Sequence, residues 1–331
     1  VTDANLVLGR LSADTFGAPG IDLVDEEARA ALATHVATPL GLNVETAAVG
    51  VTEVVDENMA NAARVHGVEN GKDISQFTVI AFGGAAPLHA GRLCEKLDAE
   101  ELLVPPGAGV GSAIGLLRAP FAYEALRSHY TPLNSFDYKA TNLLLHELTE
   151  EASKFVLSAL GSSDRSGLGL EIERCAFMRY AGQGWEIPVY LEDGLFDHLG
   201  MGLLANRFEK AYEDFFGRAI DGLSIEAIGW SVRVSTPRQN VGQIGRVEAR
   251  RDVVPRLTRS LHDTVDDVIV EAAVVERESL QIGDRVLGPA VIVEEQTSTL
   301  LATSQQAVLQ ADKCLLITKR EPTTTPTELI E

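Results

Sequence analysis

The stretch TVIAFGGAAPLHAGRL, residues 78–93, decides how the first part of this chain is expected to fold. It predicts a strand over 78–82, then a loop with two adjacent glycines, Gly83 and Gly84, and then a helix over about 87–97. Because glycine has no Cβ and adopts positive φ, a glycine pair lets the backbone approach a bound group closely. The unpaired N–H groups that open the next helix favour an anion. Two interpretations remain open, a nucleotide-binding loop and a tight turn that binds nothing.

A long helical pattern precedes this stretch. An asparagine suited to the N-cap is followed by apolar residues at three- and four-residue spacing, which predicts one continuous helix over 44–69. We expect a single apolar face that packs on a core sheet. The apolar residues at this spacing are Val44, Ala47, Ala48, Val51, Val54, Val55, Met59, Ala62 and Val65.

Polar residues interrupt this helix in the segment DENMANAARV. Asn58 and Asn61 lie three positions apart and share a helix face, although asparagine is a poor helix former. Asn58 is therefore a candidate for contact with the ligand of the glycine loop. A solvated helix face accounts for Asp56 and Glu57.

Composition sets limits on the class of protein. The 331 residues suffice for two or three domains, and 45% are hydrophobic. No apolar run reaches the ~20 residues of a membrane span, so we expect no membrane partner. The net charge of -20 argues against a nucleic-acid partner, because a phosphate backbone attracts a basic face.

The three cysteines, Cys94, Cys175 and Cys314, are far apart and lie in apolar surroundings. Their odd number argues against a disulfide framework, and their spacing is not that of a zinc site. No other metal-ligand pattern is legible, and no signal-type segment opens the chain. We therefore expect a cytoplasmic location and no resident protein-only metal site.

The order of patterns predicts three parts and a tail. Residues 1–130 are expected to be α/β, 131–223 α+β, 224–322 mostly β, and 323–331 mobile. The chain starts without methionine in VTDANLVLGRL, which is typical of the middle of a domain. We therefore expect an upstream segment.

Six blocks in order carry a resemblance to a known family. They are VTDANLVLGRL, VDENMANAARVHGVENG, VIAFGGAAPLHAGRL, VPPGAGVGSAIGLL, MRYAGQGWEIPV and GPAVIVEEQTST. Together they span nearly the whole chain and resemble the hydantoinase A/5-oxoprolinase family. Its core is similar to the actin, sugar kinase and Hsp70 ATPases. The implied fold is an actin/sugar-kinase-like ATPase lobe, followed by an α+β segment and a mostly-β C-terminal module.

The resemblance assigns roles to several residues. Gly83 and Gly84 would lie against the adenosine of ATP, and Ala85 would begin the helix that closes the pocket. His89 would contact a phosphate or relay a proton, or else cap or pack the helix. Asp3 would reach the active cleft, or else cap the next helix.

The resemblance also implies cofactors and partners. ATP and Mg²⁺ are the expected cofactors, and the phosphates would be held by an upstream ATPase half that this chain lacks. GAGVGSAIG, which follows the adenosine element, is expected to form a packing helix instead. A B-type subunit and a small-molecule substrate are the other expected partners. The isolated chain is expected to be inactive.

The activity that the family implies is phosphorylation of a cyclic amide for hydrolysis. Related ATP-dependent ketone carboxylases of the acetone and acetophenone type are the alternative. A non-enzymatic, actin-like nucleotide-binding scaffold is a further alternative.

Two other groups of polar residues are assigned structural roles. Arg179, Tyr180 and Gln183 lie at a predicted turn and are expected to form a fixed polar network. Glu294 and Glu295 end a predicted strand, and a solvated edge accounts for them.

Overall fold

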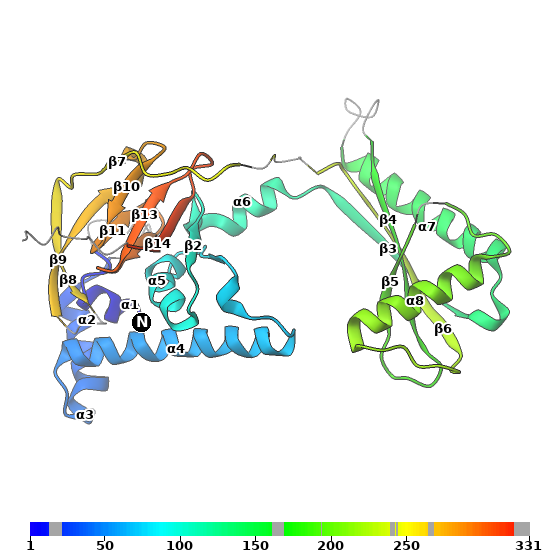
Figure 1. The fold of residues 1–331 in the computed structure, drawn as a ribbon, viewed down its shortest axis with the longest axis horizontal. Coiled ribbons are helices and arrows are strands. Elements are labelled where there is room, and N and C mark those ends of the chain that lie inside the picture. The colour runs from blue at the N-terminus through cyan, green and yellow to red at the C-terminus, as the bar shows by residue number, and fades with distance from the viewer. Residues whose placement is uncertain are drawn as a thin grey trace, which may run out of the picture. The chain divides into compact units, whose positions relative to one another are not determined.

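The computed structural model divides the chain into two compact units (Figure 1). The first contains residues 1–117 and 242–331, and the second contains residues 118–241. The residues that the structure describes are 1–12, 22–160, 169–192, 194–238, 242, 244–263 and 268–320. No helix among them is long and apolar enough to cross a membrane.

The helices of the first unit follow the sequence patterns closely. The 44–69 prediction is confirmed by α4 (Val44–Glu69), whose N-cap Asn43 accepts a hydrogen bond from the Thr46 backbone N–H at 2.7 Å. A left-handed Gly41, with φ of 68°, ends the helical segment before it. The other helices are α1 (Thr2–Val7), α2 (Asp25–Leu32), a π-helical turn (Ala33–Ala37), α3 (Thr38–Leu40), α5 (Ala86–Leu97) and α6 (Gly111–Arg118).

The buried face of α4 differs from the predicted one. Val54 and Val65 are 62% and 56% exposed, whereas Val51 packs partly buried against the cluster of α1 and α2. The innermost positions carry small or polar residues, because α4 lies close to its neighbouring helices and a large valine would hold them apart. The buried residues are Ala47, Ala48, Thr52, Asp56, Ala60 and Gly67.

Two sheets complete the first unit, and one hydrophobic cluster joins both of them to α4 and α5. The six-stranded sheet has the order β1-β2-β14-β13-β10-β7, with β1 parallel to β2 and β14 antiparallel to β2. Its strands are β1 (Val79–Ile80), β2 (Glu101–Val104), β14 (Leu315–Lys319), β13 (Gln305–Leu309), β10 (Asp284–Leu287) and β7 (Arg251–Asp252). The four-stranded sheet has the order β12 (Ser298–Leu301), β11 (Ala290–Val293), β9 (Val268–Glu276) and β8 (Leu257–Asp263).

The second unit is an antiparallel sheet with two helices packed on it. The sheet order is β3 (Ala122–Pro132), β6 (Ile225–Ser235), β4 (Glu171–Tyr180) and β5 (Ile187–Leu191). The helices α7 (Tyr138–Ala159) and α8 (Gly200–Phe216) share one hydrophobic cluster with it (Figure 1). Trp230, Tyr180 and Phe208 are its largest fully buried side chains.

The predicted boundaries at 130/131 and 223/224 need correction. β3 crosses the 130/131 boundary and β6 lies beyond the 223/224 boundary, yet the two strands pair along their length in one sheet. The C-terminal strands do not form a separate module, because β14 pairs with β2. Strand pairing joins residues far apart in sequence, which local patterns do not report. The predicted mobile tail 323–331 lies outside the described residues.

The prediction of a packed helix in GAGVGSAIG is also wrong. α6 buries none of its residues, and Leu116 and Leu117 are 80% and 88% exposed. The mixed α/β class with a strand-rich C-terminal part is as predicted.

The β2–β14 pairing predicts that a C-terminal substitution weakens the N-terminal part. Leu315 is fully buried opposite Val104 of β2, so Leu315→Ala should lower the free energy of unfolding by about 2–5 kcal/mol. Hydrogen exchange should accelerate at the β2 amides as well as in β14. Leu116→Ala, at an exposed position, is the control. Unchanged exchange in β2 would contradict the shared sheet.

Candidate functional site

The glycine loop lies where the parallel strands β1 and β2 end. The Gly83 N–H donates to the Ala108 carbonyl at 2.7 Å, and the Thr297 hydroxyl donates to the Gly84 carbonyl at 3.0 Å. Two other loops, Pro105–Gly109 and Glu294–Thr297, therefore hold it. In open α/β sheets, ligands bind at the carboxyl ends of such strands.

Gly83 and Gly84 are glycines for different structural reasons. Gly83 has a φ of +114°, which side chains rarely adopt, so glycine is required there by the backbone. Gly84 has an ordinary φ, and a Cβ built on it would find only the Gln296 carbonyl, at 3.7 Å. Within the protein, then, Gly84 has no need to be glycine. Space beside the loop is open, as close approach of a ligand requires. Ala85 is exposed and forms the N-cap of α5.

A buried polar network lies beneath α5. The Arg10 guanidinium, which can only donate, lies 3.4 Å from Asn5 Oδ1, and this orients Asn5 Nδ2 to donate to His89 Nε2 at 3.0 Å. His89 consequently carries its proton on Nδ1, and this nitrogen donates to Asp56 Oδ1 at 2.7 Å. The network thus connects α1, α4 and α5.

This network bears on the role predicted for His89. Its side chain is buried and both ring nitrogens are hydrogen-bonded, so the geometry favours the packing role over contact with a phosphate. The solvated role predicted for Asp56 is wrong, because Asp56 is fully buried. Asp56 lies four residues after Thr52 and four before Ala60, and the structure buries all three on one face of α4. Asn5 gave no comparable signal.

Two predicted site residues lie apart from the network. Asp3 is exposed in the first turn of α1, where a carboxylate stabilises the helix dipole. Asn58 is exposed and makes no side-chain hydrogen bond with another described residue. It is turned about 200° around α4 from Asp56. The structure therefore does not join either residue to His89.

Electrostatic interactions fasten α5 to its neighbours. Arg92 pairs with Glu53 at 2.9 Å, and Lys96 pairs with Glu53 and Glu57 at 2.9 and 3.0 Å. Hydrogen bonding to Glu53 is the chief reason why the pKa of Arg92 is raised. Burial lowers the pKa of Arg10, while the Asp56 carboxylate opposes this shift.

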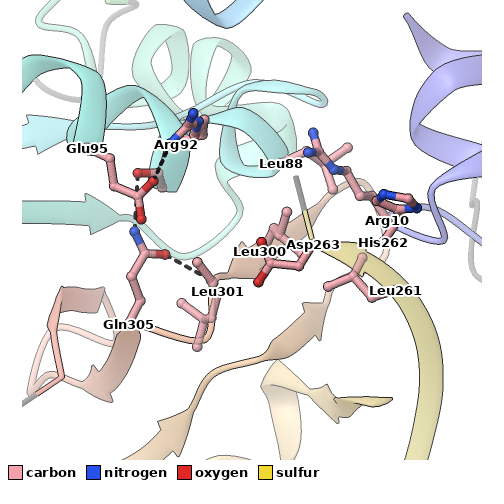
Figure 2. Close-up of a pocket in the computed structure, with 12 residues that line it drawn as sticks. Arg10, Leu88, Arg92, Glu95, Leu261, His262, Asp263, Leu300, Leu301 and Gln305 are labelled. Atoms are coloured by element: carbon pink, nitrogen blue, oxygen red, sulfur yellow. Dashed lines mark hydrogen bonds and ion pairs between the residues drawn. The ribbon is translucent and has the colours of Figure 1, made fainter. Parts of the chain in front are cut away.

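A small cavity with both polar and apolar walls adjoins this region (Figure 2). Arg10, Arg92, Asp263 and Gln305 are among the residues that line it, and its volume is about 30 Å³. A water molecule needs roughly 10–15 Å³ by this measure, so the cavity has room for a few waters and not for a nucleotide.

Other residues singled out in the sequence are structural. Arg179 pairs with Glu226 at 2.8 Å, and Gln183 donates to the Tyr212 hydroxyl at 2.9 Å, which agrees with a fixed polar network at this turn. Glu295 is exposed as predicted, but the solvated role of Glu294 is wrong, because this side chain is mostly buried and paired with Arg277.

Among the described residues, neither a reactive cysteine nor a metal site is evident. All three cysteines are buried, and burial raises the pKa of the Cys94 thiol to about 11 and of the Cys314 thiol to about 12. Such thiols are poor nucleophiles at neutral pH. Within the described ranges, no three His, Cys, Asp or Glu side chains are grouped as metal ligands would be.

Comparisons with known proteins show what this chain resembles. Residues 1–125 match the sequence profile described as hydantoinase/oxoprolinase. Caprolactamase subunit alpha of Pseudomonas jessenii is 27% identical over 91% of this chain and 43% of its own length. The acetone carboxylase beta subunit of Xanthobacter autotrophicus is 26% identical over 90% of this chain and 43% of its own length.

The fold agrees with these matches. The crystal structure of the ATP-dependent caprolactamase from Pseudomonas jessenii superposes with a TM-score of 0.73 at 25% identity, covering 97% of this chain and 47% of that chain. Residues 1–125 thus carry the hydantoinase/oxoprolinase profile, and the rest of the chain is similar to the same relatives in sequence and fold. The chain spans less than half the length of the relatives it matches.

The buried network predicts a large effect on stability. Asp56→Ala leaves the His89 Nδ1–H without its acceptor and removes the carboxylate near buried Arg10. The free energy of unfolding should fall by about 2–4 kcal/mol, measured by urea denaturation. Asn58→Ala, two positions away on the exposed side, is the control and should cost less than about 0.5 kcal/mol. Equal effects of the two substitutions would contradict the network.

Proposed function

We propose that this chain supplies the adenosine-binding part of the ATP-binding subunit of an ATP-dependent cyclic-amide hydrolase of the hydantoinase/5-oxoprolinase type. The glycine loop is the observation that carries the proposal. Gly84 has no internal need to be glycine, the space beside it is open, and the loop lies at the carboxyl ends of two parallel strands. Similarity to an ATP-dependent caprolactamase supports ATP as the cofactor.

In this proposal Gly83, Gly84 and Ala85 contact the adenosine. ATP would supply the phosphoryl group that activates an amide oxygen for hydrolysis. His89 acts on this site indirectly, because its bonds to Asn5 and Asp56 hold α5 and hence the loop that precedes it. A role in positioning needs no contact with the reacting atoms.

Two exposed residues are weaker candidates for the same site. Asp3 and Asn58 have side chains accessible to a ligand, but no described contact places them beside the glycine loop. We keep Asp3 as a candidate for the active cleft and Asn58 as a candidate for nucleotide contact. Alanine substitution at each, with nucleotide affinity as the readout, tests them separately.

The proposal requires other polypeptide segments. The relatives are more than twice as long as the part that this chain matches. A further ATPase half would hold the phosphates and Mg²⁺, and a B-type subunit would complete a cytoplasmic assembly. The relatives are named as subunits, which supports a multi-subunit enzyme.

A ketone carboxylase subunit is the second candidate. The similarity to the acetone carboxylase beta subunit is nearly as high as that to caprolactamase subunit alpha. The two candidates differ in what stimulates ATP turnover by the complete enzyme: a lactam or hydantoin for the first, and a ketone with bicarbonate for the second. For a non-enzymatic scaffold, neither addition would stimulate ATP turnover.

Substitution at Gly84 tests the adenosine site. Gly84→Val places a branched side chain where the nucleotide would lie, and the nearest protein atom to its Cβ is the Gln296 carbonyl oxygen at 3.7 Å, an ordinary contact. In the complete enzyme ATP affinity should fall at least about a hundredfold, ~2.7 kcal/mol, as measured by calorimetry. Gly50→Val is the control, because a Cβ at Gly50 also meets no atom within 4 Å. Unchanged affinity in Gly84→Val would refute the assignment.

A separate test compares this chain alone with the completed ATPase. This chain alone should bind ATP weakly and show no turnover, because the transferred phosphoryl group would lack its stabilising charges. Adding the remaining half of the ATPase should restore binding, and turnover should further require the B-type subunit. Calorimetric ATP titration beside a phosphate-release assay measures both. Steady turnover by this chain alone would show that the phosphate site lies within it.

A further inference from the structure

One side chain from the C-terminal part of the chain contacts both carbonyl groups of the glycine pair. The Thr297 hydroxyl oxygen lies 3.0 Å from the Gly84 carbonyl oxygen and 3.5 Å from the Gly83 carbonyl oxygen. A hydroxyl has a single proton, so Thr297 donates to the nearer carbonyl while it still faces the other. Its side chain is buried, so little water competes for this contact. Both carbonyl groups therefore point toward Thr297.

The directions of these carbonyl groups fix the directions of two N–H groups. The peptide bonds that follow Gly83 and Gly84 are trans, and in a trans peptide the N–H points away from the carbonyl of the same plane. The N–H groups of Gly84 and Ala85 therefore point away from Thr297. Neither N–H donates to another described residue, and both residues are exposed. The two donors are thus open to a ligand on the far side of the loop.

The turn that carries Thr297 is itself fixed. The Glu294 N–H donates to the Thr297 carbonyl at 2.9 Å and closes the turn between β11 and β12. The Glu294 carboxylate pairs with Arg277, whose side chain is buried. Arg277 Nη2 also donates to the carbonyls of Val104 and Lys313, each at 2.8 Å. One guanidinium therefore ties this turn to the end of β2 and to the turn before β14.

A third glycine lets the same turn approach the loop that follows β2. A Cβ built on Gly109 would lie 2.6 Å from the Gln296 Cβ and 2.7 Å from the Gln296 carbonyl oxygen, closer than Cβ atoms approach other atoms. Glycine is therefore needed at position 109 for this contact. Ala108, in the same loop, accepts the Gly83 N–H at 2.7 Å. The glycine loop is thus supported by Ala108 on one side and by Thr297 on the other.

We propose that Thr297 is a positioning residue for nucleotide binding, because its hydroxyl orients the Gly84 and Ala85 N–H groups toward the ligand. The inference rests on the proposed function, in which adenosine lies against the glycine loop. Adenosine carries ring nitrogens and ribose oxygens that accept hydrogen bonds from such donors. Thr297 lies behind the loop and contacts no reacting atom, so its loss should weaken ATP binding without slowing the chemical step.

Two substitutions at Thr297 test whether the hydroxyl is responsible. Thr297→Val keeps the branched shape and removes the hydroxyl, whereas Thr297→Ser keeps the hydroxyl. In the complete enzyme, calorimetry should show ATP affinity about fivefold to tenfold lower for Thr297→Val, the loss expected for one hydrogen bond, and within about twofold of the wild type for Thr297→Ser. The kcat should be unchanged in both variants.

Thr299→Val is the matched control for this experiment. Thr299 is fully buried two residues further along, and its hydroxyl has no hydrogen-bond partner among the described residues, so ATP affinity should not change. Thermal melting checks that all three variants fold. Unchanged ATP affinity in Thr297→Val would overturn the proposal, and so would equal losses in Thr297→Val and Thr297→Ser.

A measurement without ATP separates this inference from the proposed function. Backbone NMR relaxation of this chain should give order parameters near ~0.85 at the Gly84 and Ala85 amides in the wild type and in Thr297→Ser, falling toward about 0.6 in Thr297→Val. A loop that stays equally ordered in Thr297→Val would overturn the proposal. If the wild-type complete enzyme binds no ATP, the proposed function fails, whereas loss of order confined to Thr297→Val would still support Thr297 as the residue that orients these amides.

Discussion

The hydrogen bond from His89 to the Asp56 carboxylate is the contact on which the candidate site depends. It lies where exposure to water is negligible, so little competes with it, and losing either partner would leave a buried polar group unsatisfied. It fixes α5 against α4, and the Asn5 side chain fixes the same ring against α1. The start of α5, and with it the glycine loop, takes its place from these bonds.

Ion pairs at the surface also hold α5 against α4, although each pair contributes less energy than the buried hydrogen bond does. The bridges from Arg92 and Lys96 to Glu53 span α4 and α5, but they are partly exposed and screened by water. Small residues such as Ala60 permit the close helix packing that these bridges cross. Packing of small residues sets the distance between α4 and α5. The polar contacts then fix the position of one helix along the other at that distance.

The glycine loop joins two parts of the chain that are far apart in sequence. Thr297 bonds to Gly84, and Arg277 bonds to Val104 at the end of β2. The C-terminal strands are therefore part of the framework that holds the loop.

Much of this site was legible from the residues alone. The α4 and α5 helices, the glycine pair and the turn at Gly41 follow local rules of periodicity and backbone freedom, which act over a few residues and need no tertiary information. The family blocks likewise indicated the class of the fold.

Tertiary structure alone decided the rest. Asp56 and Asn58 stand two positions apart in one motif, and only packing against α1 and α5 determines that the first is buried and the second exposed. Similarly, β14 completes the sheet of β2 because hydrogen-bonded strands are chosen by geometry over the whole chain. Burial and strand pairing depend on residues distant in sequence, and therefore no local pattern contains them.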